Sequence, residues 1–182
     1  DVTLPFTRML AGSMDYEPGM LYNANKKSFR MIEGIVYSQG TRAHQAAMPI
    51  VFDSPIQFFA GNPSQGFLEP DYMELIGHLP TTWDETRAVS SEIMQHLVQV
   101  RRKGKGWWIA GMNHQQPLEL DIKLDFLGEG SYSLTTYADT PESVQRPPAL
   151  AETTREVKRG DTIKVRMENA GGFAATFQPK SR

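Results

Sequence analysis

The sequence of 182 residues contains no cysteine. This absence excludes disulfide bonds, zinc sites built on thiolates and cysteine nucleophiles, and it is compatible with oxidising and reducing compartments alike. An excess of charge of one sign is also missing, because the net charge is −2. A nucleic-acid-binding protein would show a basic surplus. No apolar run approaches the roughly 20 residues of a membrane-spanning helix. With a hydrophobic content of 40%, the composition indicates a globular chain with a core of its own.

Motifs that identify a catalytic or metal site are equally scarce. The sequence has no serine-centred nucleophile elbow, no glycine-rich phosphate loop and no calcium-binding loop. The one dense basic run, Arg101–Gly106, contains two glycines, which favours a solvated hairpin turn over a phosphate site. None of the four histidines has a second ligand at a spacing typical of zinc sites, and we expect them on the surface or satisfied in the interior: His44, His78, His96 and His114.

Up to about residue 90 the sequence predicts short helices joined by long loops. Thr3 and Thr41 are suitable N-caps for two of the helices, and Pro49 should kink the second one. Ser54-Pro55 can begin a third, short helix that ends at Gly61. The segments predicted to be helical are 3–12, 41–51, 54–61 and 69–80, the last with Met73, Ile76 and Leu79 inward.

From about Ser91 onward the hydrophobic period becomes two. Apolar residues alternate with charged ones from Leu118 to Phe126 and again from Thr162 to Glu168. We expect about six strands and therefore a small antiparallel β-sandwich over residues 91–182, with Ala138–Thr154 as a surface loop. The expected strands are HLVQVRRK, GWWIAGM, PLELDIKLDF, SYSLTTY, DTIKVRMEN and GGFAATF.

The two halves differ as folding units. The second half has enough strands to close a core, whereas the helices of the first half have apolar faces and no evident layer to cover them. We therefore expect residues 1–90 to be the end of a larger domain whose earlier part lies outside this chain. An irregular α+β single domain is the alternative.

The stretch LAGSMDYEPGM contains the best candidate for a catalytic site. Asp15 and Glu17 stand two residues apart, so on a strand both carboxylates point to one face and could act as a pair. Alternatively, Asp15 hydrogen-bonds the Pro18-Gly19 turn. Trp83 and the pair Trp107 and Trp108 are candidates for sugar-stacking platforms, although one of an adjacent pair on a strand must face the core.

Five stretches, in order along nearly the whole chain, resemble glycoside hydrolase family 97, a family of α-glucosidases and α-galactosidases. They are TLPFTRMLAGSMDYEPG, GTRAHQAAMPIVFDSPIQFFAGNP, LPTTWDETR, the VRRKG and WWIAGM hairpin, and GGFAATF. The resemblance implies an N-terminal β-super-sandwich, a central (β/α)₈ barrel and a C-terminal β-domain. On that template, residues 1–90 are the C-terminal part of the catalytic barrel and residues 91–182 are the C-terminal β-sandwich domain. The chain would thus be a mixed α/β fragment.

The same resemblance implies hydrolysis of a terminal α-linked glucose or galactose of an oligosaccharide, by an inverting or a retaining mechanism. It also implies a calcium ion and a periplasmic or secreted location. The catalytic and calcium-binding glutamates of the family align before Asp1, so we expect no metal ligand here, and this chain should be inactive without the rest of its polypeptide. Members more often have Thr at the position of Glu17 and Pro at that of Ser13, whereas Asp15 matches. Asp15 and Tyr16 are therefore expected at the substrate rim.

A second interpretation stays open. The β-sandwich could bind carbohydrate through Trp107 or Trp108, or serve a purely structural purpose without catalysis.

Overall fold

The computed structural model describes residues 1–17 and 21–180, which form ten strands, three α-helices and two 3₁₀-helices. The helices are η1 (Leu4–Phe6), η2 (Arg8–Ala11), α1 (Arg42–Val51), α2 (Pro63–Gly66) and α3 (Pro70–Gly77). The strands are β1 (Tyr22–Ala24), β2 (Tyr37–Gln39), β3 (Glu85–Glu92), β4 (His96–Lys103), β5 (Gly106–Asn113), β6 (Leu118–Lys123), β7 (Ser131–Ala138), β8 (Ala151–Lys158), β9 (Thr162–Met167) and β10 (Gly172–Pro179). None of these helices is long and apolar enough to cross a membrane.

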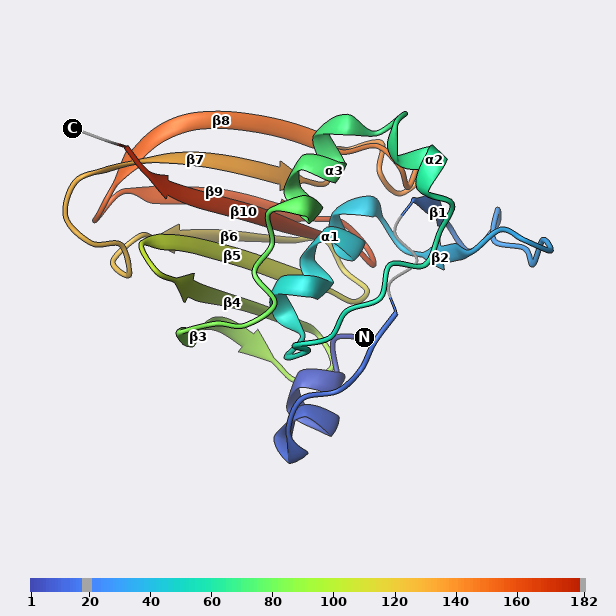
Figure 1. The fold of residues 1–182 in the computed structure, drawn as a ribbon, viewed down its shortest axis with the longest axis horizontal. Helices are drawn as coiled ribbons and strands as arrows, with labels where there is room; N and C mark the ends of the chain where they lie inside the picture. The colour runs from blue at the N-terminus through green and yellow to red at the C-terminus, as the bar shows by residue number, and fades with distance from the viewer. Residues whose placement is uncertain (18–20, 181–182) are drawn as a thin grey trace.

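The second half of the chain forms an antiparallel sheet of six strands in the order β3-β4-β5-β10-β7-β8. A two-stranded antiparallel ribbon, β6 and β9, covers one face of this sheet, and α1 lies against β5 and β10 on the other face (Figure 1). The predicted antiparallel β architecture after residue 90 is confirmed.

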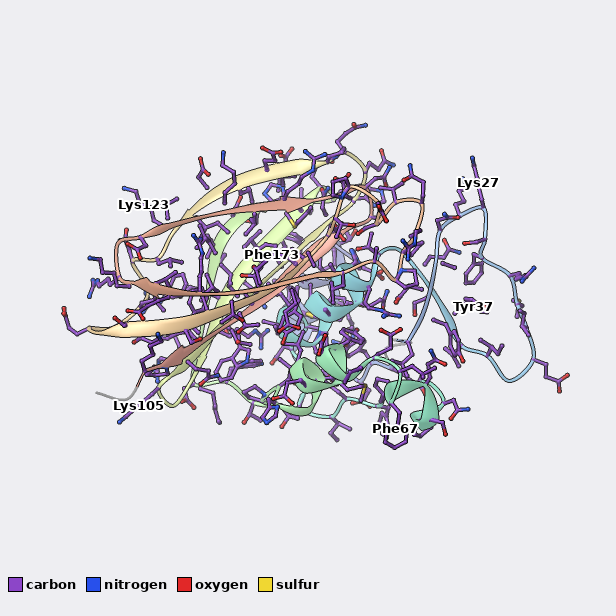
Figure 2. All side chains as sticks on the ribbon, turned by 90° about the horizontal axis from the view of Figure 1, so that it is seen from above. Lys27, Tyr37, Phe67, Lys105, Lys123 and Phe173 are labelled. Atoms are coloured by element: carbon purple, nitrogen blue, oxygen red, sulfur yellow. The ribbon has the colours of Figure 1, made fainter. Side chains whose placement is uncertain are left out.

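The alternation seen in the sequence produces the dry face of the ribbon. Ile122, Ile163 and Val165 are at most 4% exposed and point toward the sheet, whereas the charged residues between them are exposed. They meet Phe173 and Phe177 of β10 in a buried cluster. Figure 2 shows Phe173 near the middle of the molecule, between the two layers. Burial of such apolar side chains contributes roughly 1.5–3 kcal/mol each to folding.

Helix α1 is the element that joins the two halves. As predicted, it begins after Thr41, whose side chain accepts a hydrogen bond from the backbone N–H of His44 at 3.2 Å. All ten of its residues are buried. Small residues, Ala46 and Ala47, let it approach the sheet, where it shares a core with Ala110 and Met112 of β5. The expectation that its apolar face lacks a partner layer is therefore wrong, since the sheet of the second half covers it.

The carboxyl end of α1 is held by two polar side chains of β4. Gln99 Nε2 donates to the carbonyls of Ile50 at 3.1 Å and Val51 at 2.7 Å. Arg101 Nη2 donates to the same Val51 carbonyl at 3.1 Å. The last carbonyls of a helix have no partner within the helix. Here the sheet supplies the missing donors.

Two of the predicted α-helices, over residues 3–12 and 54–61, do not form. Residues 3–12 form two 3₁₀ turns, and Thr3 makes no side-chain cap. In the described structure, residues 54–61 are not helical: Ser54 Oγ donates to the Ile56 carbonyl, and Gln57 forms a parallel bridge with Tyr16. The predicted helix over 69–80 is confirmed as α3, whose most buried side chains are Tyr72 and Leu75; Met73, Ile76 and Leu79 are partly buried against the same core.

Four strands escaped the sequence pattern: the short parallel pair β1 and β2 in the first half, and β3 and β8. Strands β3 and β8 lie at the two edges of the six-stranded sheet, and most of their residues are exposed on both faces. Without a dry face they lack the alternation that identifies an inner strand. Consequently β8 takes up the end of the segment predicted as a long surface loop.

The first half contains parallel pairing. Tyr16 and Gln57 pair in parallel, with α1 between them in the sequence, and β1 pairs in parallel with β2. Parallel neighbours joined by a helix are the unit of α/β architectures. The segment between β1 and β2, which carries Lys27, extends beyond the sheets (Figures 1 and 2).

Candidate functional site

The predicted carboxylate pair lies at the surface. Asp15 and Glu17 are exposed, and Met14 and Tyr16 are half-buried, so exposure alternates along this segment as it does on a strand. The side chains of Asp15 and Glu17 form no hydrogen bond or ion pair with the described residues. The Pro18-Gly19 turn, the alternative partner of Asp15, lies outside the described residues. Neither carboxylate lines either of the two pockets presented below.

Tyr16 is anchored in the interior. Its ring meets that of Phe52 edge-on, with 5.2 Å between centroids. Its hydroxyl is buried and has no hydrogen-bond partner among the described residues. Burial, reinforced by the neighbouring Tyr72, raises the pKa of the Tyr16 phenol, which therefore stays neutral. The side chain fixes the position of the segment that carries Asp15 and Glu17.

The histidines are dispersed in the structure, as they are in the sequence. His44 is buried and its Nδ1 lies 3.0 Å from the Gly171 carbonyl, and His96 Nε2 lies 2.8 Å from the Ser90 hydroxyl. Within residues 1–17 and 21–180, no group of three or more histidine and carboxylate side chains is placed to hold a metal ion.

The adjacent tryptophans point to opposite faces of the sheet, and both are covered. Each is 6% exposed. Trp108 faces α1 and packs on Trp83 with 5.3 Å between ring centroids, while Trp107 faces the ribbon side and packs on Phe126 at the same separation. Stacking of a sugar requires an open ring face. Neither tryptophan of the pair offers one.

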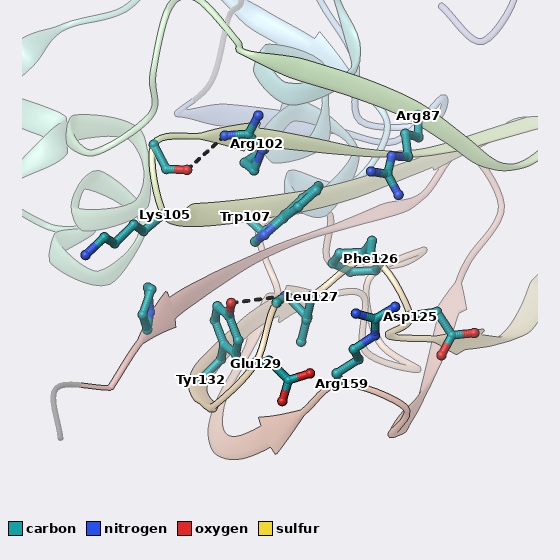
Figure 3. Close-up of a pocket in the computed structure, with 13 residues that line it drawn as sticks. Arg87, Arg102, Lys105, Trp107, Asp125, Phe126, Leu127, Glu129, Tyr132 and Arg159 are labelled. Atoms are coloured by element: carbon teal, nitrogen blue, oxygen red, sulfur yellow. Dashed lines mark hydrogen bonds between the residues drawn. The ribbon is translucent and has the colours of Figure 1, made fainter.

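A pocket with a volume of about 460 Å³ opens beside Trp107 at the end of the sandwich (Figure 3). We call it the Trp107 pocket. The β4–β5 turn, the β6–β7 loop and the β8–β9 turn meet there. Aromatic, basic and acidic side chains share its lining, which comprises Arg87, Arg102, Gly104, Lys105, Trp107, Asp125, Phe126, Leu127, Gly128, Glu129, Tyr132, Arg159 and Pro179.

Two arginines cover the ring of Trp107. The guanidinium carbons of Arg87 and Arg102 lie 5.7 and 5.8 Å from the ring centroid. Both side chains also pair with Glu85, with Arg102 Nε 3.2 Å from Glu85 Oε2. Sequence reasoning identified the turn in this region and missed the pocket, because its lining comes from five separate stretches between residues 87 and 179.

A second, smaller pocket of about 180 Å³ lies between α3 and the start of β8. Its buried cation, Arg42, pairs with Glu69 at 2.5 Å and donates to the Asn23 side chain at 3.0 Å and the Leu21 carbonyl at 2.9 Å. The guanidinium also lies 5.4 Å from the Tyr72 ring centroid. These partners satisfy Arg42 from within the chain, which identifies it as a structural tie.

Comparison with known proteins identifies a protein family whose model matches the second half of this chain. A family model described as "Glycosyl-hydrolase 97 C-terminal, oligomerisation" matches residues 82–178. A retaining alpha-galactosidase of Bacteroides thetaiotaomicron is 32% identical over 174 residues, which is 96% of this chain and 26% of the relative. A probable retaining alpha-galactosidase of Streptomyces bingchenggensis is 30% identical over 95% of this chain and 25% of its own length.

Solved structures of glycoside hydrolases superpose on nearly the whole chain. A glycoside hydrolase family 97 enzyme of Pseudoalteromonas sp. in complex with acarbose superposes with a TM-score of 0.84 and 28% identity, over 99% of this chain and 28% of that one. A beta-arabinopyranosidase superposes with a TM-score of 0.71 and 26% identity, over 93% of this chain and 26% of that one. The chain thus spans about a quarter of the length of these relatives.

Proposed function

Because the chain belongs to glycoside hydrolase family 97, we propose that it is the C-terminal portion of an enzyme that hydrolyses terminal α-linked galactose or glucose of oligosaccharides. The observation that carries the proposal is the asymmetry of the alignments. Nearly all of this chain aligns with two relatives named as α-galactosidases, but it accounts for about a quarter of each. Most of the catalytic machinery then belongs to the remaining three quarters. The names of the two relatives favour galactose over glucose as the substrate.

Features of the first half support its place at the end of a (β/α)₈ barrel. The parallel bridge between Tyr16 and Gln57, with α1 as the connection, is what two neighbouring barrel strands require. Apolar side chains also remain uncovered near this bridge and directly after α2: Ile56 is 56% exposed, Phe58 58% and Phe67 86%. The upstream barrel segments of the same polypeptide would bury them, which makes this polypeptide the principal partner of the chain.

Within this arrangement, Asp15 and Tyr16 lie at the rim of the active site. The exposed Asp15 contributes to substrate binding, and Tyr16, with its hydroxyl buried, holds the segment in place, with Glu17 as a local variation. The calcium ion expected from the family needs several oxygen ligands, and within residues 1–17 and 21–180 no group of three histidine and carboxylate side chains could hold it alone. Its ligands then come from the upstream part. A periplasmic or secreted location remains part of the proposal.

The proposal is tested by assaying the 182-residue chain and the full polypeptide on nitrophenyl α-galactoside and α-glucoside. We expect the full polypeptide to turn over one or both substrates and the 182-residue chain to match buffer, since hydrolysis needs two opposed carboxyl groups. Turnover by the short chain that disappears in Asp15→Asn or Glu17→Gln would refute the proposal and establish these residues as catalytic. An intact-mass measurement on the native source should find a polypeptide of several times 20.5 kDa.

A further inference from the structure

We propose that residues 25–36, between β1 and β2, bind the part of an oligosaccharide that lies beyond its terminal sugar. We call this segment the arm. The inference rests on the proposed function, because it names a further part of the substrate of the same active site. In a (β/α)₈ barrel the active site is built by the segments that follow the carboxyl ends of the strands. The arm belongs to such a segment, since it lies between the bridge at Tyr16 and helix α1.

Both segments of the parallel bridge lead to the side of the molecule on which the arm lies. In Figure 1 the segment after η2 runs toward β1, and the segment after α1 runs to α2; β1, β2 and α2 all lie at the right. The arm extends farther on that side, away from the six-stranded sheet (Figures 1 and 2). It therefore lies at the face where the carboxyl ends of the barrel strands would meet.

The length of the connection that contains the arm indicates a function. It comprises residues 18–40, between the bridge segment and the Thr41 cap of α1. Strand-to-helix connections usually have about 2–6 residues, and loops longer than about 12–15 residues are usually functional or disordered. The arm has turns of its own, since Asn25 Oδ1 accepts hydrogen bonds from the N–H groups of Lys27 and Ser28, both at 3.0 Å. These turns give it the defined shape that favours ligand binding.

The exposed side chains of the arm combine apolar surface with hydrogen-bond donors. Phe29 is 37% exposed and Met31 96%, and neither belongs to the buried clusters of the protein. Lys26, Lys27 and Arg30 are exposed and form no ion pair with the described residues. A sugar unit has C–H groups that pack on aromatic and apolar faces, and hydroxyl groups that accept hydrogen bonds. The mixture suits a hydrated sugar chain better than a dry contact with upstream segments, where three unpaired cations would lose their hydration.

The direction of the arm selects the far part of the substrate. An enzyme that releases a terminal sugar holds this sugar innermost, so the other units of the oligosaccharide project out of the barrel. Asp15 lies at the rim in the proposed function, and the arm follows it in the chain and extends outward. The arm is therefore placed for the later sugar units and not for the reacting one.

The test uses the full polypeptide and substrates with and without sugar units beyond the reacting one. α-Galactosyl fluoride and α-glucosyl fluoride have no second sugar, whereas raffinose and maltotriose have two further units. For the trisaccharide that the polypeptide hydrolyses, Phe29→Ala should lower kcat/KM about fivefold, as expected for the loss of an aromatic contact. For the fluoride of the same sugar, kcat/KM should change by less than about twofold.

Met94→Ala is the matched control for Met31→Ala, which should act in the same direction as Phe29→Ala. Met94 is 61% exposed and lies in the β3–β4 turn, outside the arm. Its substitution should change kcat/KM by less than about twofold for either kind of substrate. The urea midpoint should be unchanged in all three variants, because none of these side chains belongs to the buried clusters.

The outcomes separate this inference from the proposed function. Equal losses of kcat/KM on the trisaccharide and the fluoride would overturn the inference and indicate that upstream segments cover the arm. Arm variants that behave like Met94→Ala would also overturn it, while hydrolysis by the unsubstituted polypeptide would still support the proposed function. If that polypeptide hydrolyses none of the four substrates, the proposed function fails and the inference fails with it.

Discussion

The hydrogen bonds from β4 to the carboxyl end of α1 predict that substitutions of Gln99 and Arg101 have non-additive effects on stability. Gln99→Leu removes the donor to the carbonyls of Ile50 and Val51, and Arg101→Met removes the second donor to Val51. Each single variant leaves the Val51 carbonyl with one of these donors. The double variant leaves it with neither. The two substitutions should therefore destabilise the protein by more than the sum of their separate effects.

The magnitudes follow from burial and donor number. Gln99→Leu leaves the buried Ile50 carbonyl without this donor and should cost about 2 kcal/mol. Arg101→Met also relieves a desolvation penalty, since burial lowers the pKa of the Arg101 guanidinium to about 10; a net cost of about 1 kcal/mol is expected. The double variant should cost about 4 kcal/mol, so the coupling free energy is about 1 kcal/mol.

Urea titrations of the four proteins, followed by near-ultraviolet circular dichroism, measure the cycle. Gln115→Leu is the control, because this glutamine is exposed and its substitution should stay within about 0.5 kcal/mol. By heating, Gln99→Leu should lower Tm by about 4–8 °C for a chain of this size. Additive losses, with coupling below about 0.3 kcal/mol, would refute the reasoning that the two side chains share one carbonyl.

Three further predictions concern the surroundings of α1, and each is read as a change in the free energy of unfolding in urea. Gly172→Ala should cost about 2 kcal/mol or more, since a Cβ there would lie 2.7 Å from the Gly111 carbonyl oxygen. The control is Gly77→Ala in α3, which has open space around it and should be neutral or stabilising. Equal losses of stability in the two variants would contradict this account. Thr41→Ala should cost about 1 kcal/mol through its lost cap, whereas Thr3→Ala should change stability by less than about 0.5 kcal/mol. Burial lowers the pKa of His44 below its ordinary value of 6.5, so below pH 6.5 the unfolded chain binds the proton more readily and the protein loses stability as the pH decreases. One such group contributes a slope of at most about 1.4 kcal/mol per pH unit. This slope should be shallower in His44→Gln, and an unchanged slope would exclude His44 as its source.

Much of the fold could be predicted because its determinants are local. The Thr41 cap and the 41–51 helix depend on residues a few positions apart, and the strict alternation in β6 and β9 records one dry and one wet face. Where the determinant is a distant partner, the prediction was wrong. The pattern of residues 54–61 suits a helix, but Gln57 pairs with Tyr16, forty-one positions earlier in the chain.

The candidate sites show the same contrast between features set by neighbours in the sequence and features set by distant partners. Asp15 and Glu17 were found because they are neighbours in sequence, and the structure leaves both exposed and outside the two pockets. The Trp107 pocket is formed by side chains that only the sheet topology brings together, such as Arg87 of the edge strand β3 and Arg159 of the turn that follows the other edge strand, β8. A sequence pattern has no means of recording that proximity.

Helix α1 lies against the six-stranded sheet on one side and connects the two segments of the parallel bridge on the other. Both halves therefore pack on the same helix. Neither half can be exchanged in a chimaera unless the new half matches the surface of α1 that it must cover. A β-domain excised from its helix would lose the cover over Ala110, Met112 and Ala174 and become prone to aggregate. In evolution, such a domain should be inherited together with its helix and not recombined as a separate module.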